Sequence, residues 1–267
     1  MHPYFDSPTP HLFGHRGASA KAPENTLVAF ERAWACGVPY LETDCHATRD
    51  GEIVILHDPA VDRTTDGSGP ARDLRFSEVQ RLDAGFRFTP DGGRTFPYRG
   101  QGIRIPRLVE VLEHFPEARI NLEVKAEDPE AADEVLRIVR QTGAAPRMLL
   151  AAEKDGVLEH IRKLAPGTAI GSSLGDVVAF FQAFREGEIE GHTPRGQALQ
   201  IPPRFMGEDL VTLESVEAAH RLDLRIHVWT VNEPEEMVRL LGCGVDGLMS
   251  DDPETLVRVA REHAGAR

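Results

Sequence analysis

The chain has 267 residues, of which 41% are hydrophobic and 27% are charged, a balance that supports a packed core and excludes a largely disordered chain. Its formal net charge of −13 would repel phosphate backbones at long range, so we expect no nucleic acid partner. The three cysteines, Cys36, Cys45 and Cys243, lack metal-ligand spacing and favour a reducing cytoplasm as the compartment. We expect no signal peptide and no transmembrane segment, because no suitably long apolar run occurs.

The opening part of the chain alternates strands with one helix. A strand is predicted over residues 11–14, and a helix with Asn25 as its N-cap follows, with an apolar face over 27–34. Further strands are predicted over 40–48 and 53–56. Two runs joined by a tight turn would ordinarily give a hairpin, but we expect the chain to bend within one layer of a barrel here.

Residues 59–105 are rich in Arg, Asp, Gly and Thr, and such a long loop is usually functional. From residue 106 the rhythm is regular. Helices are predicted over 108–115, 129–141, 157–164, 176–186, 213–222, 234–241 and 253–263, and strands over 119–125, 147–152, 168–173, 198–201, 225–231 and 247–250. About eight strand-helix units predict an α/β protein, a single (β/α)8 TIM barrel, with its site at the carboxyl ends of the strands. We expect one domain over 1–267 with an insertion at about 59–105.

Acidic side chains mark the predicted strand ends. Glu42 and Asp44 are two residues apart on one strand, so their side chains project to the same face. Carboxylates held together repel unless a cation lies between them, and a hard divalent cation prefers oxygen ligands; two exposed acids on a sheet edge are the alternative. With Glu123 from another strand, three carboxylates could supply the protein ligands of a Mg²⁺ or Ca²⁺ site.

Basic and titratable residues end the same strands. Arg16 and Lys125 are cations that could bind a phosphate, and His15 and His57 could serve as an acid and a base near neutral pH. Trp229 is equally consistent with a substrate wall and with core packing. Cation, basic side chains and an acid/base pair are the groups needed to cleave a phosphodiester.

Other polar residues receive structural roles. His46 lies beyond Asp44 on the same face, and we expect it at the rim rather than among the metal ligands. The pair Asp251 and Asp252 is expected to cap the last helix, which begins with Pro253. The glycines do not form a dinucleotide-binding pattern.

A series of short motifs runs along nearly the whole chain. In order they are Gly14-His15-Arg16-Gly17, Pro23-Glu24-Asn25-Thr26, Glu42-x-Asp44, Thr48-x-Asp50-Gly51, His57-Asp58, Asp62-Arg63-Thr64-Thr65, Asn121-Leu122-Glu123-Val124-Lys125, Val228-Trp229-Thr230-Val231-Asn232 and Asp246-Gly247-Leu248-Met249-Ser250-Asp251. This set resembles the glycerophosphodiester phosphodiesterase family. Many relatives have Ser-Phe where this chain has Ala151-Ala152-Glu153, so the head-group preference is left open.

The resemblance implies a TIM barrel that hydrolyses glycerophosphodiesters to glycerol 3-phosphate and an alcohol with a divalent cation. It implies these roles: metal binding by Glu42, Asp44 and Glu123, catalysis by His15 and His57, and phosphate contact by Arg16 and Lys125. Attack by water and attack by a glycerol hydroxyl, through a cyclic phosphate, both stay open, as does the choice of base. The alternatives are a lipid phosphodiesterase of the lysophospholipase D type and a non-catalytic barrel that binds a ligand.

Overall fold

The computed structural model describes residues 2–125, 129–164 and 167–265. The elements, in chain order, are η1 (Pro3–Phe5), β1 (His11–His15), α1 (Leu27–Ala35), β2 (Tyr40–Ala47), β3 (Ile53–Ile55), η2 (Ala71–Asp73), α2 (Phe76–Val79), α3 (Leu108–His114), β4 (Arg119–Val124), α4 (Pro129–Gln141), η3 (Ala145–Arg147), β5 (Met148–Ala151), α5 (Asp155–Leu164), β6 (Ala169–Ile170), α6 (Leu174–Glu186), η4 (Ile189–Gly191), β7 (Ala198–Ile201), β8 (Arg204–Phe205), β9 (Glu208–Asp209), α7 (Leu213–Arg221), β10 (Arg225–Val228), α8 (Pro234–Gly242), β11 (Gly247–Ser250) and α9 (Pro253–Gly265).

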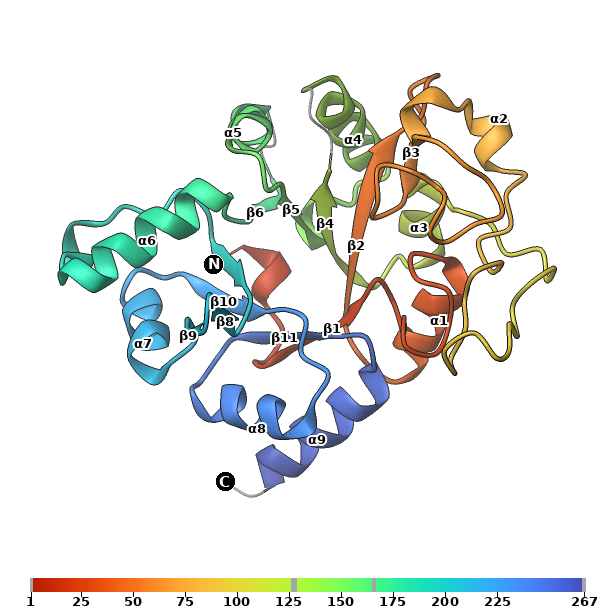
Figure 1. Cartoon of the computed structure of the whole chain (residues 1–267). Coiled ribbons are helices and arrows are strands. Elements are labelled where there is room, and N and C mark those ends of the chain that lie inside the picture. The colour runs from red at the N-terminus through yellow and green to blue at the C-terminus, as the bar shows by residue number, and fades with distance from the viewer. Residues whose placement is uncertain (1, 126–128, 165–166, 266–267) are drawn as a thin grey trace.

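Parallel strands form a ring with helices outside it (Figure 1). Their order is β6-β5-β4-β2-β1-β11-β10-β7, and a parallel bridge between Gly171 and Ala198 joins the two end strands. Within the described residues this gives eight parallel strands, and the TIM barrel predicted from the sequence is confirmed. The carboxyl ends of these strands therefore meet at one rim of the barrel, where sites lie in this fold.

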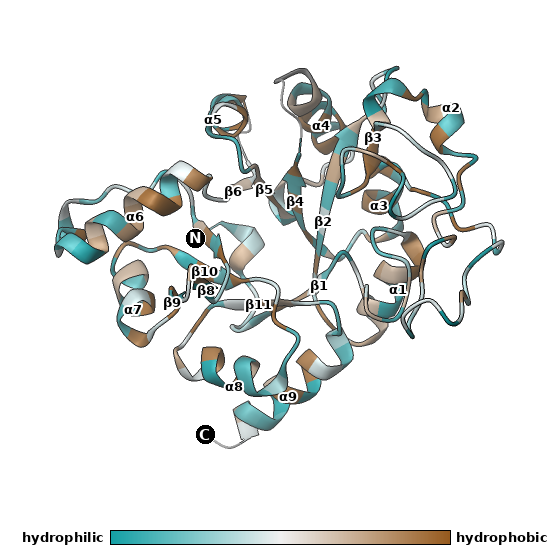
Figure 2. Ribbon diagram, in the orientation of Figure 1, coloured by the Kyte–Doolittle hydropathy of each residue, from teal (hydrophilic) through white to brown (hydrophobic). Residues whose placement is uncertain are grey.

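Strand β2 shows how the layers are built. Leu41 and Cys45 belong to the apolar layer between the sheet and the helices, together with Phe30 of α1, whereas Tyr40 packs inside the barrel. Successive side chains of a strand alternate between faces, so Glu42 and Asp44 share the inner face with Tyr40. Brown and teal residues alternate along the surrounding helices in Figure 2, as amphipathic helices on a barrel require.

The amino end of the barrel is closed by the first turn of the chain. Tyr4 and Phe5 of η1 are buried with Phe13 and Tyr40 inside the barrel, and the Tyr40 hydroxyl donates a hydrogen bond of 2.8 Å to the Tyr4 carbonyl. In Figure 1 this red turn lies within the ring of strands. Aromatic side chains therefore fill this end of the barrel.

Two expectations about the first half of the chain are wrong. The N-cap of α1 is Thr26, whose hydroxyl accepts from the Ala29 N–H at 3.3 Å, because Asn25 adopts a left-handed conformation at φ 57°. Strand β3 pairs antiparallel with β2, so the two runs do form a hairpin. A second short hairpin, β8–β9, was not predicted.

The segment of residues 59–105 has a small apolar core of its own. Val61, Ala71, Val79 and Ala84 are buried there against Val54. In Figure 1 the segment, orange to yellow, lies outside the ring beside α1. We keep as a proposal that it is an insertion in a single domain that spans residues 1–267.

Candidate active site

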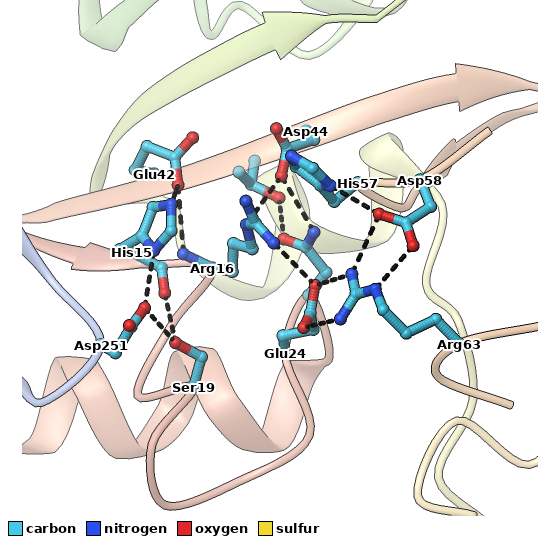
Figure 3. Close-up of polar contacts among 12 residues, drawn as sticks. His15, Arg16, Ser19, Glu24, Glu42, Asp44, His57, Asp58, Arg63 and Asp251 are labelled. Atoms are coloured by element: carbon cyan, nitrogen blue, oxygen red, sulfur yellow. Dashed lines mark hydrogen bonds and ion pairs between the residues drawn. The ribbon is translucent and has the colours of Figure 1, made fainter. Parts of the chain in front are cut away.

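His15 is the last residue of β1, and its imidazole is oriented by Asp251. The His15 Nδ1 atom lies 2.6 Å from Asp251 Oδ1. Ser19 Oγ donates to the same oxygen at 2.8 Å (Figure 3), and Asn232 Nδ2 donates to Asp251 Oδ2 at 2.7 Å. Burial alone would raise the pKa of Asp251, but these hydrogen bonds and the charge of His15 lower it to about 2. Asp251 is therefore ionised and can only accept.

The other ring nitrogen of His15 faces the acidic interior. His15 Nε2 lies 3.8 Å from Glu42 Oε2, and His15 and Glu42 are register partners on β1 and β2. Burial opposes protonation of His15, but the carboxylates of Glu42 and Asp251 outweigh it and raise the pKa of the imidazole. Of the acidic pair predicted to cap the last helix, Asp252 makes the capping contact, because its Oδ1 accepts from the Thr255 N–H at 3.4 Å.

Arg16 stands in a strained backbone conformation that fixes its side chain. Its φ is 55°, a region that side chains other than glycine rarely adopt. The Arg16 N–H donates to Glu42 Oε2 at 3.1 Å, and the guanidinium contacts Glu24 Oε1 at 3.1 Å and Asp44 Oδ2 at 3.4 Å. A Cβ on Gly17 would come within 2.5 Å of the Ala29 backbone, so only glycine lets this loop lie against α1.

The three predicted metal ligands lie on the neighbouring strands β2 and β4. Asp44 is opposite Glu123 and Glu42 is opposite Asn121. Lys125 Nζ lies between two of the acids, 2.8 Å from Glu123 Oε2 and 3.5 Å from Asp44 Oδ1. Burial, and then the Asp44 carboxylate, raise the pKa of Glu42 to about 8. Burial and the neighbouring acid therefore favour the protonated form of Glu42.

Asn25 adds an amide to this cluster. Its Nδ2 donates to Asp44 Oδ2 at 3.2 Å and its Oδ1 accepts from Thr43 Oγ1 at 2.8 Å. The left-handed backbone that displaced Asn25 from the helix cap therefore places its amide beside the acids.

His57 follows β3, whose hairpin with β2 brings it toward Asp44. The Leu56 N–H donates to the Asp44 carbonyl at 3.0 Å. His57 Nδ1 lies 2.7 Å from Asp58 Oδ1, and His46 Nε2 lies 3.0 Å from the His57 carbonyl oxygen. His46 therefore supports the backbone of His57 from the rim, where we expected it.

Asp58 is held by Arg63 from the loop that follows. Arg63 Nε donates to Asp58 Oδ2 at 2.6 Å. The hydrogen bonds from Arg63, then that from His57, outweigh burial and lower the pKa of Asp58 to about 2. Figure 3 shows His57, Asp58 and Arg63 beside Asp44, and His15 with Asp251 on the other side of Arg16.

Trp229 lies at the end of β10, where its N–H donates to the Ile201 carbonyl at 3.1 Å. The side chain is 41% exposed, so it is no core filler. Its role in substrate binding stays a prediction.

The acids fit a divalent cation by their chemistry. They supply oxygen donors only, which Mg²⁺ and Ca²⁺ prefer, and Glu42 is buried beside the Asp44 carboxylate, both of which raise its pKa. Across residues 2–125, 129–164 and 167–265, however, no group of three or more His, Cys, Asp or Glu side chains lies so that it could hold a metal ion, and Arg16 and Lys125 lie against these carboxylates.

Several residues of the site received no catalytic or binding role from the sequence, which predicts Asp251 only as a helix cap. Asp58, Arg63, Glu24, Asn232 and Asp251 all belong to the motifs. Nothing in the spacing says that Asp251 lies beside His15, because 236 positions separate them. The signal for Asp58 was its place next to His57.

Two histidines paired with aspartates beside clustered acids and basic side chains define a barrel hydrolase for a charged ester. The model of the glycerophosphoryl diester phosphodiesterase family matches residues 15–255, and the chain belongs to this family. A glycerophosphodiester phosphodiesterase of Caldanaerobacter subterraneus subsp. tengcongensis is 32% identical over 94% of this chain and 98% of its own length. The recognition of the family and the enzyme class predicted from the sequence are thereby confirmed.

Solved structures agree with this fold. A glycerophosphoryl diester phosphodiesterase domain from Mycobacterium tuberculosis superimposes with a TM-score of 0.84 at 20% identity, over 93% of this chain and 98% of that chain. An Oleispira antarctica phosphodiesterase, solved in complex with the product sn-glycerol-3-phosphate, gives a TM-score of 0.77 at 25% identity, over 94% and 97% of the two chains. Among the described residues, no helix is long and apolar enough to cross a membrane.

Proposed function

We propose that this protein hydrolyses glycerophosphodiesters to glycerol 3-phosphate and an alcohol, with His15 and His57 as the acid/base pair. The observation that carries the proposal is the pairing of each imidazole Nδ1 with an aspartate, at 2.6 Å for Asp251 and 2.7 Å for Asp58. Both aspartates have pKa values of about 2, so each stays ionised and accepts a hydrogen bond from an Nδ1–H, which leaves Nε2 for the substrate.

Two proton transfers are then needed. One histidine removes a proton from the nucleophile through Nε2, as a new P–O bond forms to the nucleophile's oxygen. The other donates a proton to the leaving alcohol as its P–O bond breaks. The nucleophile is either water or a glycerol hydroxyl, and the second route requires a further hydrolysis of the cyclic phosphate.

Glu42, Asp44 and Glu123 are the proposed ligands of a divalent cation, Mg²⁺ or Ca²⁺. When bound, such a cation neutralises charge on the phosphoryl oxygens. The buried Glu42, which is 5% exposed, supports this role, because burial of an acid without a counter-charge is costly.

Arg16 and Lys125 are the proposed phosphate contacts. Both side chains are about one-fifth exposed, at 19% and 20%, so their charges lie at the border of the buried acids. Trp229 is the proposed wall for the alcohol part of the substrate. The three cysteines are free thiols, which supports the proposed reducing cytoplasm.

The test is release of glycerol 3-phosphate from glycerophosphocholine by the purified protein. We expect release that EDTA abolishes and that added Mg²⁺ or Ca²⁺ restores. Glu42→Gln is the matched variant, and it should need more metal for half-maximal rate. Absence of release under either metal, from a folded sample, would contradict the proposal, and release that EDTA leaves unchanged would contradict its metal requirement.

A second candidate, hydrolysis of lysophospholipids, is favoured by one feature. Large apolar side chains are exposed on elements that follow the carboxyl ends of β6, β7 and β10. They are Leu174 at 59%, Phe205 at 61%, Met206 at 89% and Trp229 at 41% exposed. Exposed apolar groups beside a site suit an acyl chain.

The same assay separates the two candidates. If the acyl chain lies on this rim, the double variant Phe205→Ser and Met206→Ser should lose kcat/KM for lysophosphatidylcholine and keep it for glycerophosphocholine. Equal losses for both substrates would argue against the lipid reading.

A further inference from the structure

Glu24 and Arg63 belong to two different motifs, and neither has a role in the reaction as described. One guanidinium joins two carboxylates. Arg63 Nη1 and Nη2 donate to Glu24 Oε2 and Oε1 at 2.7 and 2.8 Å. Its Nε and Nη2 donate to Asp58 Oδ2 and Oδ1 at 2.6 and 3.1 Å. Arg63 therefore forks onto Glu24 and Asp58 at once (Figure 3).

Stability alone gives a poor reason for this arrangement. The Arg63 side chain is 47% exposed, and exposed ion pairs typically contribute about 0–1 kcal/mol. The arrangement is also specific to arginine, because lysine lacks the planar fork that two bidentate contacts require. What distinguishes Arg63 is its neighbour, since Asp58 is the residue that contacts His57 Nδ1.

The contacts of Asp58 determine which ring nitrogen of His57 is available to a substrate. Both Asp58 oxygens accept from Arg63, which keeps the carboxylate ionised and fixes its plane. An ionised carboxylate can only accept, so the neutral imidazole carries its proton on Nδ1. The lone pair of Nε2 is then free on the opposite edge of the ring. His46 holds the His57 backbone at the same time.

The same network continues to the acids. Glu24 Oε1 also accepts from Arg16 Nη1 at 3.1 Å, and Arg16 Nε lies 3.4 Å from Asp44 Oδ2. Burial opposes ionisation of Glu24, but the hydrogen bonds from Arg63 and the charges of both arginines lower its pKa. Charges of alternating sign thus run from Asp58 through Arg63, Glu24 and Arg16 to Asp44.

We propose that Arg63 and Glu24 form a positioning clamp that fixes the orientation and the Nδ1–H tautomer of His57 through Asp58, and that fixes Arg16 against Asp44. The inference rests on the proposed function in one respect, the use of His57 as acid or base. It adds two positioning residues that do not touch the reacting atoms. Because the clamp joins two loops, it sets the spacing between the histidine and the acids.

The first test is kinetic. Arg63→Met should lower kcat for glycerophosphocholine about 10- to 100-fold and change KM little. Losses of this size are usual when a residue that orients a site residue through a hydrogen bond is removed. Arg63→Lys should recover only part of kcat, and added guanidinium ion should restore part of the activity of Arg63→Ala, since the site is half-exposed. Arg137→Met is the control. Arg137 is 49% exposed and pairs with Glu134 on α4, away from the rim, and its loss should leave kcat unchanged.

The second test needs no substrate. The ¹⁵N chemical shifts of the His57 ring report which nitrogen carries the proton. The wild-type protein should show the Nδ1–H form, and Arg63→Met should show a mixture of tautomers. If Arg63→Met does not fold, Glu24→Gln, which keeps the size of the side chain and removes one acceptor of the fork, should shift the same signals by less.

The two measurements separate the clamp from the proposed function. A tautomer shift in Arg63→Met, from a protein that hydrolyses no glycerophosphodiester, would support the clamp and refute the reaction. Normal kcat and an unchanged tautomer in the folded Arg63→Met or Glu24→Gln variant would overturn the clamp. A loss of kcat in Arg137→Met equal to that in Arg63→Met would also overturn it.

Discussion

Strand β1 carries a histidine at each end, and the surroundings at the two ends of the barrel shift the pKa values of these histidines in opposite directions. His11 and His15 lie four residues apart, so both project to the inner face. At the amino end, burial lowers the pKa of His11 to about 4. At the carboxyl end, the carboxylates of Glu42 and Asp251 raise the pKa of His15 in spite of its burial.

The partners explain this difference. His11 Nδ1 lies 3.3 Å from His227 Nε2, and both rings pack against aromatic neighbours such as Phe5 and Phe13. Neither ring gains a counter-ion in hydrogen-bond contact, and a charge on one would repel a charge on the other. His15 instead contacts an ionised aspartate. A histidine in a barrel therefore becomes a site residue through its partners, and strand position alone does not decide it.

The clearest test of the role of the carboxyl-end histidines is the activity of their alanine variants. We expect His15→Ala and His57→Ala to lower kcat/KM by about 10²–10⁴-fold, the range for an acid/base group, with folding intact. Measurement of glycerol 3-phosphate release and of circular dichroism checks both statements. Near-normal turnover in either variant would remove that histidine from the mechanism.

A matched control exists for these variants. His160 forms an exposed pair with Asp133 at 2.8 Å, on helices outside the barrel, so His160→Ala removes a histidine–aspartate contact without touching the rim. Its kcat/KM should equal that of the wild type.

The two buried histidines at the amino end should make the free energy of unfolding fall at acidic pH. The pKa values of His11 and His227 are lowered by burial, so the unfolded chain binds these protons more readily than the folded one. Their contribution to stability is complete above pH 6.5 and is lost as the pH falls toward 4. For His11 this loss is on the order of 2–3 kcal/mol, measurable by urea unfolding.

A double variant isolates this contribution from acid effects elsewhere. His11→Leu with His227→Leu removes both titrating rings and keeps the site apolar, so its free energy of unfolding should fall less between pH 6.5 and 4. The same pH slope in the double variant and the wild type would show that the buried pair does not cause the sensitivity.

At the carboxyl end, the aspartate behind His15 should matter less than the imidazole itself. Asp251→Asn keeps the shape but offers His15 Nδ1 an amide whose orientation is also set by Ser19 and Asn232. We expect kcat to fall about 10- to 100-fold, with KM nearly unchanged. A loss as large as that of His15→Ala would instead mean that the tautomer of His15 depends wholly on the Asp251 carboxylate.

Much of the fold could be predicted because local patterns and barrel geometry agree. The alternation of helices and strands gave the barrel, and a spacing of two placed Glu42 and Asp44 on one face. The sequence does not say whether the second strand joins the ring or folds back, so the expected bend within one layer was wrong and the hairpin of β2 and β3 was missed. The sequence predicts Asn25 as a helix cap because asparagine often caps helices. That preference does not take account of the hydrogen bonds that Asn25 makes with Thr43 and Asp44.

The site was harder to predict beyond its motifs. The acids and the histidines carry a chemical signature by residue type, so they could be named. The pairing of Asp251 with His15 depends on β11 lying beside β1, which brings chain ends together and leaves no local trace. The fork of Arg63 depends on loop conformations, which composition does not encode.

The smallest expected effect is a change in KM on replacement of Trp229, with the other tryptophan, Trp34, as the comparison. Trp229 lies at the carboxyl rim and is 41% exposed, and Trp34 lies near the end of α1 and is 39% exposed. If Trp229 forms a wall for a cationic alcohol such as choline, Trp229→Leu should raise KM for glycerophosphocholine about 2- to 5-fold, which corresponds to a cation–π contact of about 0.5–1 kcal/mol, with kcat unchanged.

Trp34→Leu is the control for this change, since it removes an equally exposed indole from the helix layer. A helix runs back along the barrel after its strand, so the end of α1 lies toward the amino end, far from the rim, and KM should stay constant. A substrate with an uncharged alcohol sharpens the test, because Trp229→Leu should then raise KM less than with choline. Equal increases for both alcohols would mean that Trp229 contributes apolar contact and no attraction for a positive charge.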